Sequence, residues 1–379
     1  MSLLELQTHR FRNLGPDRLQ FSPGVNLIYG DNGSGKSSLL EAVHYLSTGR
    51  SFRTHKHETV VAHGGDEMAV FGRVSKTAGR SRVGTDPNGK SVTHNLGISR
   101  NLAERRTTLR LDGENVRSLS ILAQHLPISV IEPGSFDIIS GGPGKRRQFL
   151  DWVVFHVEHR FAGLWQRCQK VISQRNRLLR SGRIDDALLR AWNQEYLTIA
   201  NQVTSERQRW FEELVPLVQG LLNGLDAPWA SDLSLDLFRG WDRQRELGDV
   251  LEQHFDQERK VGHTLYGPNR CDVRIRVGSK PAGETLSRGQ QKTLVILLKL
   301  AQGELLYRER NISCGFLLDD INAELDIFHQ RVLAQQLQRL GSQVFVTSIS
   351  RPDPAVLWQN AMADLRMFHV EHGVLRKET

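Results

Sequence analysis

The stretch Gly30-Asp31-Asn32-Gly33-Ser34-Gly35-Lys36-Ser37 has the pattern G-x-x-x-x-G-K-[ST]. It follows a short apolar run, Val25-Asn-Leu-Ile-Tyr29, and precedes Ser38-Leu-Leu-Glu-Ala-Val-His-Tyr-Leu46, which has helical character. A strand, a glycine-rich loop and a helix in this order form the context in which the pattern binds nucleotide phosphates. The glycines let backbone N–H groups turn inward, and the helix N-terminus adds the positive end of its dipole. The stretch therefore predicts an α/β fold that binds a nucleoside triphosphate.

Two side chains of this loop have separate expected roles. Lys36 is expected to reach the β- and γ-phosphates, and the hydroxyl of Ser37 is expected to hold Mg²⁺. The remaining contacts to the phosphates are expected from the loop as a whole, Gly30 to Ser37, and from Ser38 behind it. ATP and Mg²⁺ are therefore the expected cofactors.

A second part of the site is expected far downstream. Gly315-Phe-Leu-Leu-Asp319-Asp320 is an apolar run that ends in two acids. Asp319 fits the carboxylate that orders Mg²⁺, and Asp320 fits a base for the attacking water. A strand that ends in two aspartates is also a common turn, but the phosphate loop upstream favours the catalytic interpretation of Lys36, Asp319 and Asp320.

A third element is Ser287-Arg288-Gly289-Gln290, followed by Gln291, Lys292 and the apolar run Thr293–Ala301. Ser287 is expected to cap a buried helix, and a helix N-terminus opened by Ser-x-Gly can bind an anion. Since the loop at Gly30–Ser37 already surrounds one set of phosphates, this segment would serve the γ-phosphate of a nucleotide held by another copy. A capped core helix without a ligand is the alternative.

The order of the three elements is that of ABC-type ATPases, and their spacing selects among these. Lys36 and Asp319 are 283 residues apart, so the chain must leave the ATPase core and return. Transporter ATPase domains have a much smaller insertion and carry a His after the next strand, whereas Gln343–Ser350 ends without one. The insertion is too short for the coiled coils of SMC proteins. We therefore expect an SMC-like head without a long coiled coil.

The chain resembles the RecF family of bacterial recombination and gap-repair ATPases along most of its length. Family-like segments occur in order, and together they are far more specific than the phosphate loop. They are His9-Arg-Phe-Arg-Asn13, Leu40-Glu-Ala-Val-His-Tyr-Leu-Ser47, Gly49-Arg-Ser-Phe-Arg53, Pro143-Gly-Lys-Arg-Arg-Gln-Phe-Leu-Asp151, Gln174-Arg-Asn-Arg-Leu-Leu179, Gly267-Pro-Asn-Arg270, Ser287-Arg-Gly-Gln-Gln-Lys292, Asp319-Asp320 and Ala323-Glu-Leu-Asp326.

This resemblance implies a function that the residues alone do not. Two heads would sandwich two ATP molecules in an ATP-dependent homodimer that clamps duplex or gapped DNA, and slow, DNA-stimulated hydrolysis would release it. The family acts in recombinational repair and helps RecR and RecO load RecA. Arg12 and Asn13, in the opening motif, join the expected nucleotide contacts on this ground.

The split of the site predicts the domain organisation. Residues 1–135 and 270–379 are expected to form an ABC-type P-loop head, with a mixed sheet, helices and an antiparallel β lobe. Residues 136–269 are expected to form an inserted helical arm. In the lobe, Met68–Val74 and Thr107–Asp112 are expected to be antiparallel strands, joined through Asp86-Pro-Asn-Gly89.

Charge is distributed in blocks. The formal net charge is +8 over 379 residues, and 145–210 holds 13 basic and 6 acidic residues, whereas 211–258 holds 3 and 11. Such blocks suit a DNA surface and a separate protein contact, or solvated helix faces. In the arm, the basic residues expected to spread around a helix are Arg167, Lys170, Arg175, Arg177, Arg180 and Arg183.

Composition excludes several classes of protein. Hydrophobic residues make up 39 % and no apolar run is long enough to cross a bilayer, so neither a disordered chain nor a membrane partner is expected. No leader is visible, and we expect a cytoplasmic protein. Cys168, Cys271 and Cys314 form no C-x-x-C and are expected to be isolated buried thiols. A transporter's ATPase subunit and a non-catalytic scaffold locked by ATP remain as alternatives.

Overall fold

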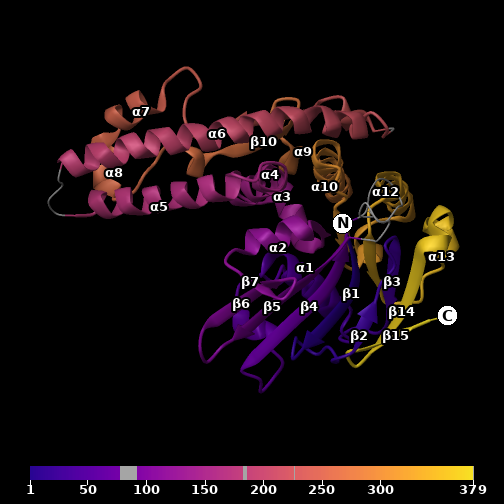
Figure 1. The fold of residues 1–379 in the computed structure, drawn as a ribbon. Helices are drawn as coiled ribbons and strands as arrows, with labels where there is room; N and C mark the ends of the chain where they lie inside the picture. Colours follow the sequence, from indigo (N-terminus) through magenta and orange to yellow (C-terminus); the bar gives the residue numbers. More distant parts are fainter. Residues whose placement is uncertain (77–91, 182–185, 226, 379) are drawn as a thin grey trace. The chain divides into compact units, whose positions relative to one another are not determined.

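The structure is a computed structural model that describes residues 1–76, 92–181, 186–225 and 227–378 (Figure 1). The chain divides into two compact units. The first unit comprises Met1–Ser135 and Lys292–Thr379, and the second comprises Phe136–Gln291.

The first unit contains a mixed sheet whose central strands are parallel. Its order is β15-β14-β3-β13-β12-β8, and all neighbours are parallel except β14 and β15. The inner strands β3, β12 and β13 and the edge strand β8 are almost entirely buried and mainly apolar, as expected for a sheet covered on both faces. The strands are β3 (Val25–Tyr29), β8 (Ile128–Ile131), β12 (Gly315–Leu318), β13 (Val344–Ser348), β14 (Leu365–Glu371) and β15 (Val374–Lys377).

A second sheet of this unit is antiparallel throughout, with the order β2-β1-β4-β5-β6-β7. The expected antiparallel lobe is therefore confirmed, but β5 lies between the two strands singled out from the sequence. The turn Asp86–Gly89 lies outside the described residues. The strands are β1 (Ser2–His9), β2 (Arg18–Gln20), β4 (Glu67–Ser75), β5 (Thr93–Asn101), β6 (Arg106–Leu111) and β7 (Glu114–Val116).

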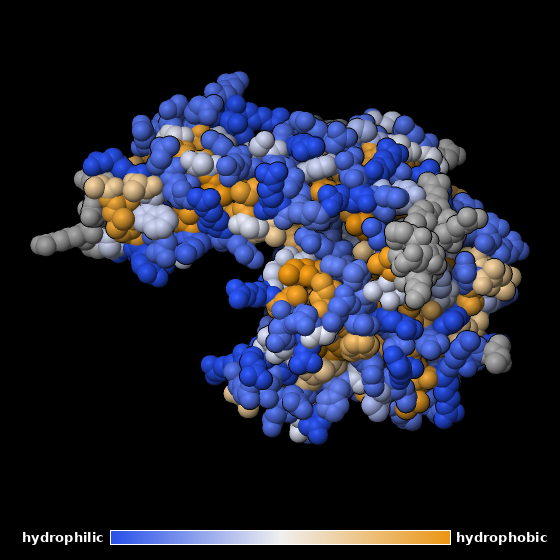
Figure 2. Space-filling model, viewed as in Figure 1, coloured by the Kyte–Doolittle hydropathy of each residue, from blue (hydrophilic) through white to orange (hydrophobic). Residues whose placement is uncertain are grey.

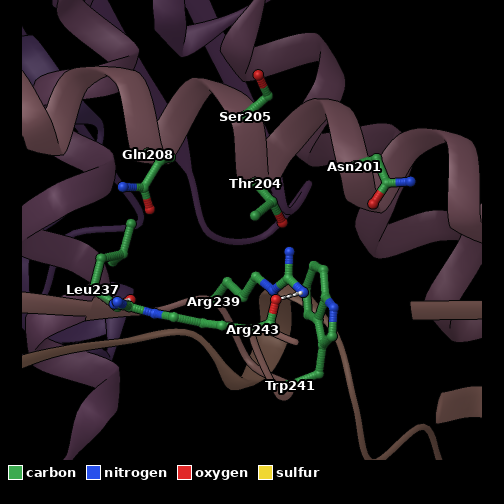
Figure 3. A pocket seen from close by; sticks show the side chains of 8 residues that line it. All are labelled: Asn201, Thr204, Ser205, Gln208, Leu237, Arg239, Trp241 and Arg243. Carbon is green, nitrogen blue, oxygen red and sulfur yellow. Dashed lines mark hydrogen bonds between the residues drawn. The ribbon is translucent and has the colours of Figure 1, made fainter. Parts of the chain in front are cut away.

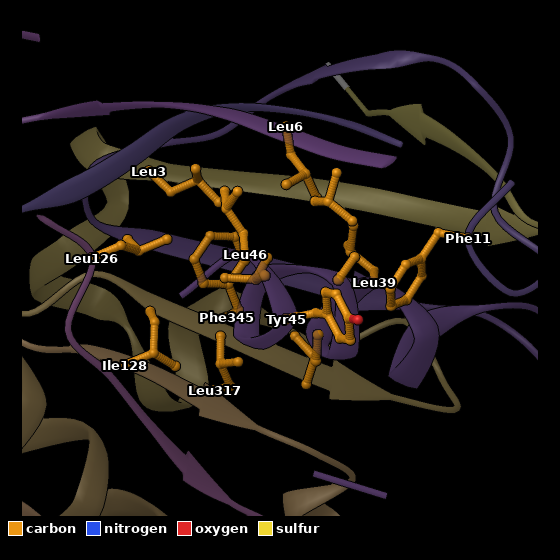
Figure 4. Packing of buried hydrophobic residues seen from close by; sticks show 14 of the residues in the cluster. Leu3, Leu6, Phe11, Leu39, Tyr45, Leu46, Leu126, Ile128, Leu317 and Phe345 are labelled. Carbon is orange, nitrogen blue, oxygen red and sulfur yellow. The ribbon is translucent and has the colours of Figure 1, made fainter. Parts of the chain in front are cut away.

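One hydrophobic core joins both sheets through α1 (Lys36–Thr48). Leu39 and Leu46 of this helix are fully buried and belong to the same cluster as Leu3 and Leu6 of β1 and Phe345 of β13 (Figure 4). Because α1 starts directly after the glycine-rich loop, this core fixes the direction in which the loop points. Burial of such side chains contributes about 1.5–3 kcal/mol each.

The other helices of the first unit are mostly short. The long helix α10 (Arg288–Arg310) begins in the second unit, and its residues from Lys292 onward belong to the first. The expected burial of this helix is confirmed, since most residues of Thr293–Leu306 are buried. The remaining helices are α2 (Leu119–His125), α11 (Ile321–Glu324), α12 (Ile327–Leu340) and α13 (Pro354–Leu357), with 3₁₀ turns at His57–Val60, Pro133–Phe136 and Gln359–Asp364.

The second unit is mainly helical, as expected. Helices α5 (Phe161–Leu179) and α6 (Asp186–Leu222) lie side by side along their length (Figure 1). Shorter elements complete it: α3 (Asp137–Ser140), α4 (Pro143–Val157), α7 (Leu247–Gln253), α8 (Phe255–Val261), α9 (Ala282–Thr285), and 3₁₀ turns at Pro228–Ala230 and Pro268–Arg270.

The second unit also contains a small antiparallel sheet that the sequence analysis did not predict. Its order is β11-β10-β9, from β9 (Leu233–Phe238), β10 (Asp272–Val277) and β11 (Lys280–Pro281). Because β10 pairs with β9, residues 270–291 group with the arm. The return to the head at residue 270 was therefore placed too early, and the first unit resumes at Lys292.

Several arginines of the basic arm have structural partners. Arg175 is fully buried, and its Nη2 lies 2.5 Å from Glu258 Oε2, also fully buried. Arg207 donates two hydrogen bonds to Asp151, at 2.7 and 2.9 Å. Arg175, one of the basic residues expected to spread around this helix, therefore fills a polar core position and is not exposed. Arg183 lies outside the described residues.

The surface is ordinary for a globular protein. Figure 2 shows one face, on which hydrophilic side chains prevail and apolar ones form separate patches. Within the described ranges, no helix is both long and apolar enough to span a bilayer. The expected isolated thiols are confirmed, since Cys168, Cys271 and Cys314 are free and buried.

Candidate functional site

The glycine-rich loop connects β3 to α1, as its sequence context predicted. Gly30, Gly33 and Gly35 have φ values of 152°, 80° and 120°, in the region that favours glycine. A Cβ on Gly30 would lie 2.3 Å from the carbonyl oxygen of Val370, so a side chain cannot fit there. Gly35 precedes α1 and offers no side chain to cap it, which leaves the first-turn N–H groups for a ligand.

The loop has the polar features of an anion site. Lys36 Nζ donates to the carbonyl oxygens of Gly30 and Asp31, at 2.7 and 2.8 Å. Burial lowers the pKa of Lys36, and the negative charges of nearby Asp320, Asp319 and Asp31 oppose this shift. Ser34 Oγ is buried and has no hydrogen-bond partner in the described part of the chain. The loop residues thus fit a bound phosphate chain.

The two distant halves of the expected site meet at Ser37. Its Oγ donates to Asp319 Oδ1 at 2.9 Å, although 282 residues separate them in sequence. The meeting follows from the sheet, because β3 and β12 both pair with β13 and all three run parallel. A hydroxyl and a carboxylate at this separation are suitable ligands for Mg²⁺. These two residues fit the expected metal site.

Asp319 and Asp320 are further held by a residue from β13. Thr347 Oγ1 donates to Asp319 Oδ1 at 2.9 Å and accepts from the backbone N–H of Asp320 at 2.8 Å. Asp320 has a φ of 51° and a ψ of 44°, a left-handed conformation that aspartate tolerates better than most residues. Non-glycine residues in such conformations cluster at functional sites.

Residues of the opening motif His9–Asn13 form hydrogen bonds with the glycine-rich loop and with α1. Asn13 Nδ2 donates to the carbonyl oxygen of Gly33 at 3.2 Å, and Ser38 Oγ donates to Asn13 Oδ1 at 2.8 Å. Arg12 donates two hydrogen bonds to the fully buried carboxylate of Glu41, at 2.9 and 2.7 Å. Arg12 therefore braces α1 in the structure, while Asn13 and Ser38 brace the loop.

The C-terminal hairpin also supports the loop. Gly373, in the turn between β14 and β15, donates its N–H to the carbonyl oxygen of Ser34 at 2.7 Å and accepts from Gly15 N at 2.9 Å. Its φ is 80°, and a Cβ there would lie 1.7 Å from the carbonyl oxygen of Asn13. Only glycine fits at this position.

The segment Ser287–Gln290 belongs to the second unit and starts α10. Ser287 N donates to Gln290 Oε1 at 2.9 Å, and Gln290 N donates to Ser287 Oγ at 3.4 Å. This is a reciprocal capping box, which confirms Ser287 as the helix cap. Ser287, Arg288 and Gly289 are exposed. The segment is therefore available on the surface of its unit.

Three supporting residues were missed by sequence reasoning: Thr347, Glu41 and Gly373. For Thr347 a signal existed, because carboxyl ends of parallel strands share the ligand-binding edge of a sheet. Thr347 lies at that end of the strand next to β12. Glu41 and Gly373 offered no such signal, since their roles depend on contacts between distant segments.

Comparison with known proteins decides the family. The model of the RecF/RecN/SMC N terminal domain matches residues 2–375. The chain is 52 % identical over its full length to the full-length DNA replication and repair protein RecF of Marinobacter nauticus. The chain belongs to the RecF family. It is also 42 % identical to the RecF protein of Pseudomonas paraeruginosa, over 100 % of this chain and 98 % of that one.

Solved structures agree with this membership of the RecF family. The recombination mediator protein RecF-ATP of the RecFOR pathway matches with a TM-score of 0.83 and 25 % identity, over 100 % of this chain and 98 % of that one. An Smc head bound to the C-winged helix domain of ScpA matches with a TM-score of 0.55 and 16 % identity, over 100 % of this chain and 98 % of that one. The latter likeness concerns the fold alone. The expected ABC-type, SMC-like head is confirmed.

Proposed function

We propose that this protein is an ATP-driven DNA clamp of recombinational repair and replication restart. The observation that carries the proposal is the convergence of Lys36, Ser37 and Asp319 at one end of β3 and β12, with Asp320 and Thr347 beside them. Membership of the RecF family and the likeness to RecF-ATP support ATP as the nucleotide.

The first step is binding of the triphosphate by the loop. Lys36 would exchange the carbonyl oxygens of Gly30 and Asp31 for phosphate oxygens, and the first-turn N–H groups of α1 would donate to the same chain. Ser37 and Asp319 would hold Mg²⁺, which neutralises phosphate charge when bound. The buried Ser34 hydroxyl supports phosphate binding by the loop, since it lacks a hydrogen-bond partner in the described residues.

Hydrolysis would use Asp320 as the base that accepts a proton from the attacking water. The hydrogen bond from its N–H to Thr347 fixes the backbone, so the carboxylate extends from a rigid point. Thr347 also donates to Asp319, so one side chain would help to position both aspartates. Weak, DNA-stimulated ATPase activity is the expected consequence.

The second nucleotide contact would come from another copy of the chain. The exposed capping box at Ser287–Gln290 lies at the N-terminus of α10, whose positive dipole end suits a γ-phosphate held by a partner subunit. Two heads would thereby close on two ATP molecules. Hydrolysis would remove the shared γ-phosphates and part the heads.

DNA would be held without sequence preference through the phosphate backbone. Exposed Lys170 and Arg177 on α5 remain suited to this role, whereas Arg175 does not because it is buried. The RecFOR pathway of the related structure supports RecR and RecO as partners and RecA loading at gaps as the outcome. Such a protein would work in the bacterial cytoplasm.

The mass of the protein in solution tests the proposal. Light scattering after gel filtration should give a dimer with ATP and a monomer with ADP. Ser287→Arg should keep ATP binding but stay monomeric, and Asp320→Asn should hydrolyse ATP slowly and give longer-lived dimers. A dimer that forms equally well in Lys36→Met with ATP would contradict the sandwich.

A further inference from the structure

A polar hollow lies within the second unit, between α6 and the segment that follows β9. Its volume is about 430 Å³, and its lining includes Asn201, Thr204 and Gln208 from α6 and Arg239, Trp241 and Arg243 from the other side (Figure 3). In Figure 3 the guanidinium of Arg239 points toward the polar side chains of α6. The hollow is far in sequence from every residue of the ATP site.

Arg239 is held in a fixed position. Its Nη2 donates to the carbonyl oxygens of Asp242, Arg243 and Arg245, at 2.9, 3.1 and 2.7 Å. Its guanidinium carbon lies 4.5 Å from the ring centroid of Trp241, which is only 2 % exposed. A guanidinium that is stacked and anchored in this way is already oriented for a ligand, because little side-chain entropy is left to lose.

Arg239 differs from the buried arginines of the same unit. Arg175 and Arg207 each pair with a carboxylate, whereas Arg239 forms no ion pair with any described residue. Within the described ranges its Nε is buried without a hydrogen-bond partner, as are Thr204 Oγ1 and Trp241 Nε1. A positive charge in a polar hollow without a carboxylate favours an anionic ligand.

A second, more apolar hollow continues from the first. Its volume is about 280 Å³, and it shares Gln208, Leu237 and Arg243 with the polar hollow. Its apolar lining comes from α6 and from the edge strand β9, namely Phe211, Val215, Pro216 and Leu235. The two hollows form one groove along α6, here called the arm groove.

The charge around the arm groove argues against a polyanion. Two carboxylates, Glu212 and Asp236, line the second hollow, and they belong to a segment, 211–258, that holds 11 acidic and 3 basic residues. Arg243 is partly neutralised, since its Nη2 lies 2.5 Å from Asp236 Oδ1. A DNA strand carries a negative charge at every phosphate, so these acids would repel it. A ligand with a single carboxylate between basic residues would avoid this repulsion.

We propose that the arm groove binds a short peptide segment of a partner protein. The segment would place a carboxylate at Arg239 and a neighbouring apolar side chain between Val215 and Leu235. Lysine or arginine on both sides of these two residues would face Glu212 and Asp236. The outer edge of β9 pairs with no other described strand, although the Leu237 carbonyl oxygen on β9 accepts from Arg243, and this edge suits an extended peptide backbone. The site is independent of ATP hydrolysis.

The test uses the full-length protein and fluorescein-labelled, acetylated peptides. Each peptide carries one Leu and one Glu, one to three positions apart, between paired lysines, and binding is followed by fluorescence anisotropy. At least one spacing should bind, and replacing its Glu by Gln should weaken binding about tenfold or more, as expected for a charged hydrogen bond. Hydrogen exchange should then slow at 201–216 and 233–245.

Protein variants separate the proposed contacts from general charge. Arg239→Gln should weaken the Glu peptide about tenfold without further weakening the Gln peptide, and Val215→Glu should weaken both. Gln208→Glu keeps Arg239 and adds a negative charge that repels the peptide's Glu. It should weaken binding of the Glu peptide, and it provides a test even if Arg239→Gln unfolds. Arg190→Gln, an equal charge change at an exposed position of α6, should have no effect.

Two results would overturn the proposal. One is equal binding of the Glu and Gln peptides, or no binding at any spacing. The other is displacement of the peptide by oligothymidylate at matched concentration, which would assign the arm groove to DNA phosphates.

Discussion

Thr347 Oγ1 lies 2.9 Å from Asp319 Oδ1 and 2.8 Å from the backbone nitrogen of Asp320. One fully buried hydroxyl thus donates to the proposed metal-binding carboxylate and accepts from the residue proposed as the base. Thr347 lies on β13, the strand next to β12, which ends at the acid pair. This contact links the carboxylate of Asp319 to the backbone of Asp320.

Removing the hydroxyl should therefore slow hydrolysis more than nucleotide binding. Thr347→Val keeps the shape of the side chain but leaves the N–H of Asp320 without its partner and leaves Asp319 Oδ1 with Ser37 as its side-chain donor. An activation barrier raised by about 1–3 kcal/mol corresponds to about fivefold to 150-fold slower turnover. Single-turnover phosphate release at saturating ATP measures this effect.

Thr347→Ser provides the matched control, since it restores the hydroxyl. Its turnover should stay near that of the parent protein. If the Val and Ser variants hydrolyse ATP at the same rate, the hydroxyl has no positioning role.

The buried ion pair of Arg175 and Glu258 should be a major determinant of arm stability. Arg175→Met leaves a fully buried carboxylate unpaired, which costs about 3–5 kcal/mol. Arg167→Met removes an exposed arginine paired with Glu195 and should cost at most about 1 kcal/mol. Urea unfolding of the two variants measures the difference, and equal losses would show that burial of the pair is unimportant.

Stability of the arm should decrease as the solution becomes acidic. Burial lowers the pKa of His156 from 6.5 to about 3, so the folded arm keeps this side chain neutral. Below pH 6.5 the unfolded chain binds a proton that the folded chain does not, and this group's contribution falls by about 1.4 kcal/mol per pH unit until pH 3.

His156→Phe should remove this component of the pH dependence. Its melting temperature should fall less between pH 7.5 and 5.5 than that of the parent protein. His55→Phe, at an exposed position, should behave like the parent. A parent-like fall in His156→Phe would mean that other groups cause the acid sensitivity.

Local sequence predicted the structural context of the phosphate loop, the acid pair and the helix cap, because each depends on short-range features. The loop from Gly30 to Ser37, the acid pair at Asp319 and the cap at Ser287 each depend on a few adjacent residues. The parallel sheet then brings the first two together at a common edge. The hydrogen bond between Ser37 and Asp319 is the direct result.

Contacts between distant segments could not be predicted in the same way. The pairing of β10 with β9 joins residues separated by more than thirty positions, so the boundary of the arm was misplaced. Arg175 resembles its exposed neighbours in sequence and differs in its partners Glu258, Asn193 and Thr264, which come from other segments. Gly373 reaches the phosphate loop from the other end of the chain.

The most direct test of the DNA clamp is fluorescence anisotropy of a labelled gapped duplex, titrated with protein in ATP, in ADP and without nucleotide. The account predicts tight binding only with ATP, weakening steeply as salt rises, and loss of this binding in Ser287→Arg. Binding that is the same in all three nucleotide conditions would contradict an ATP-gated clamp.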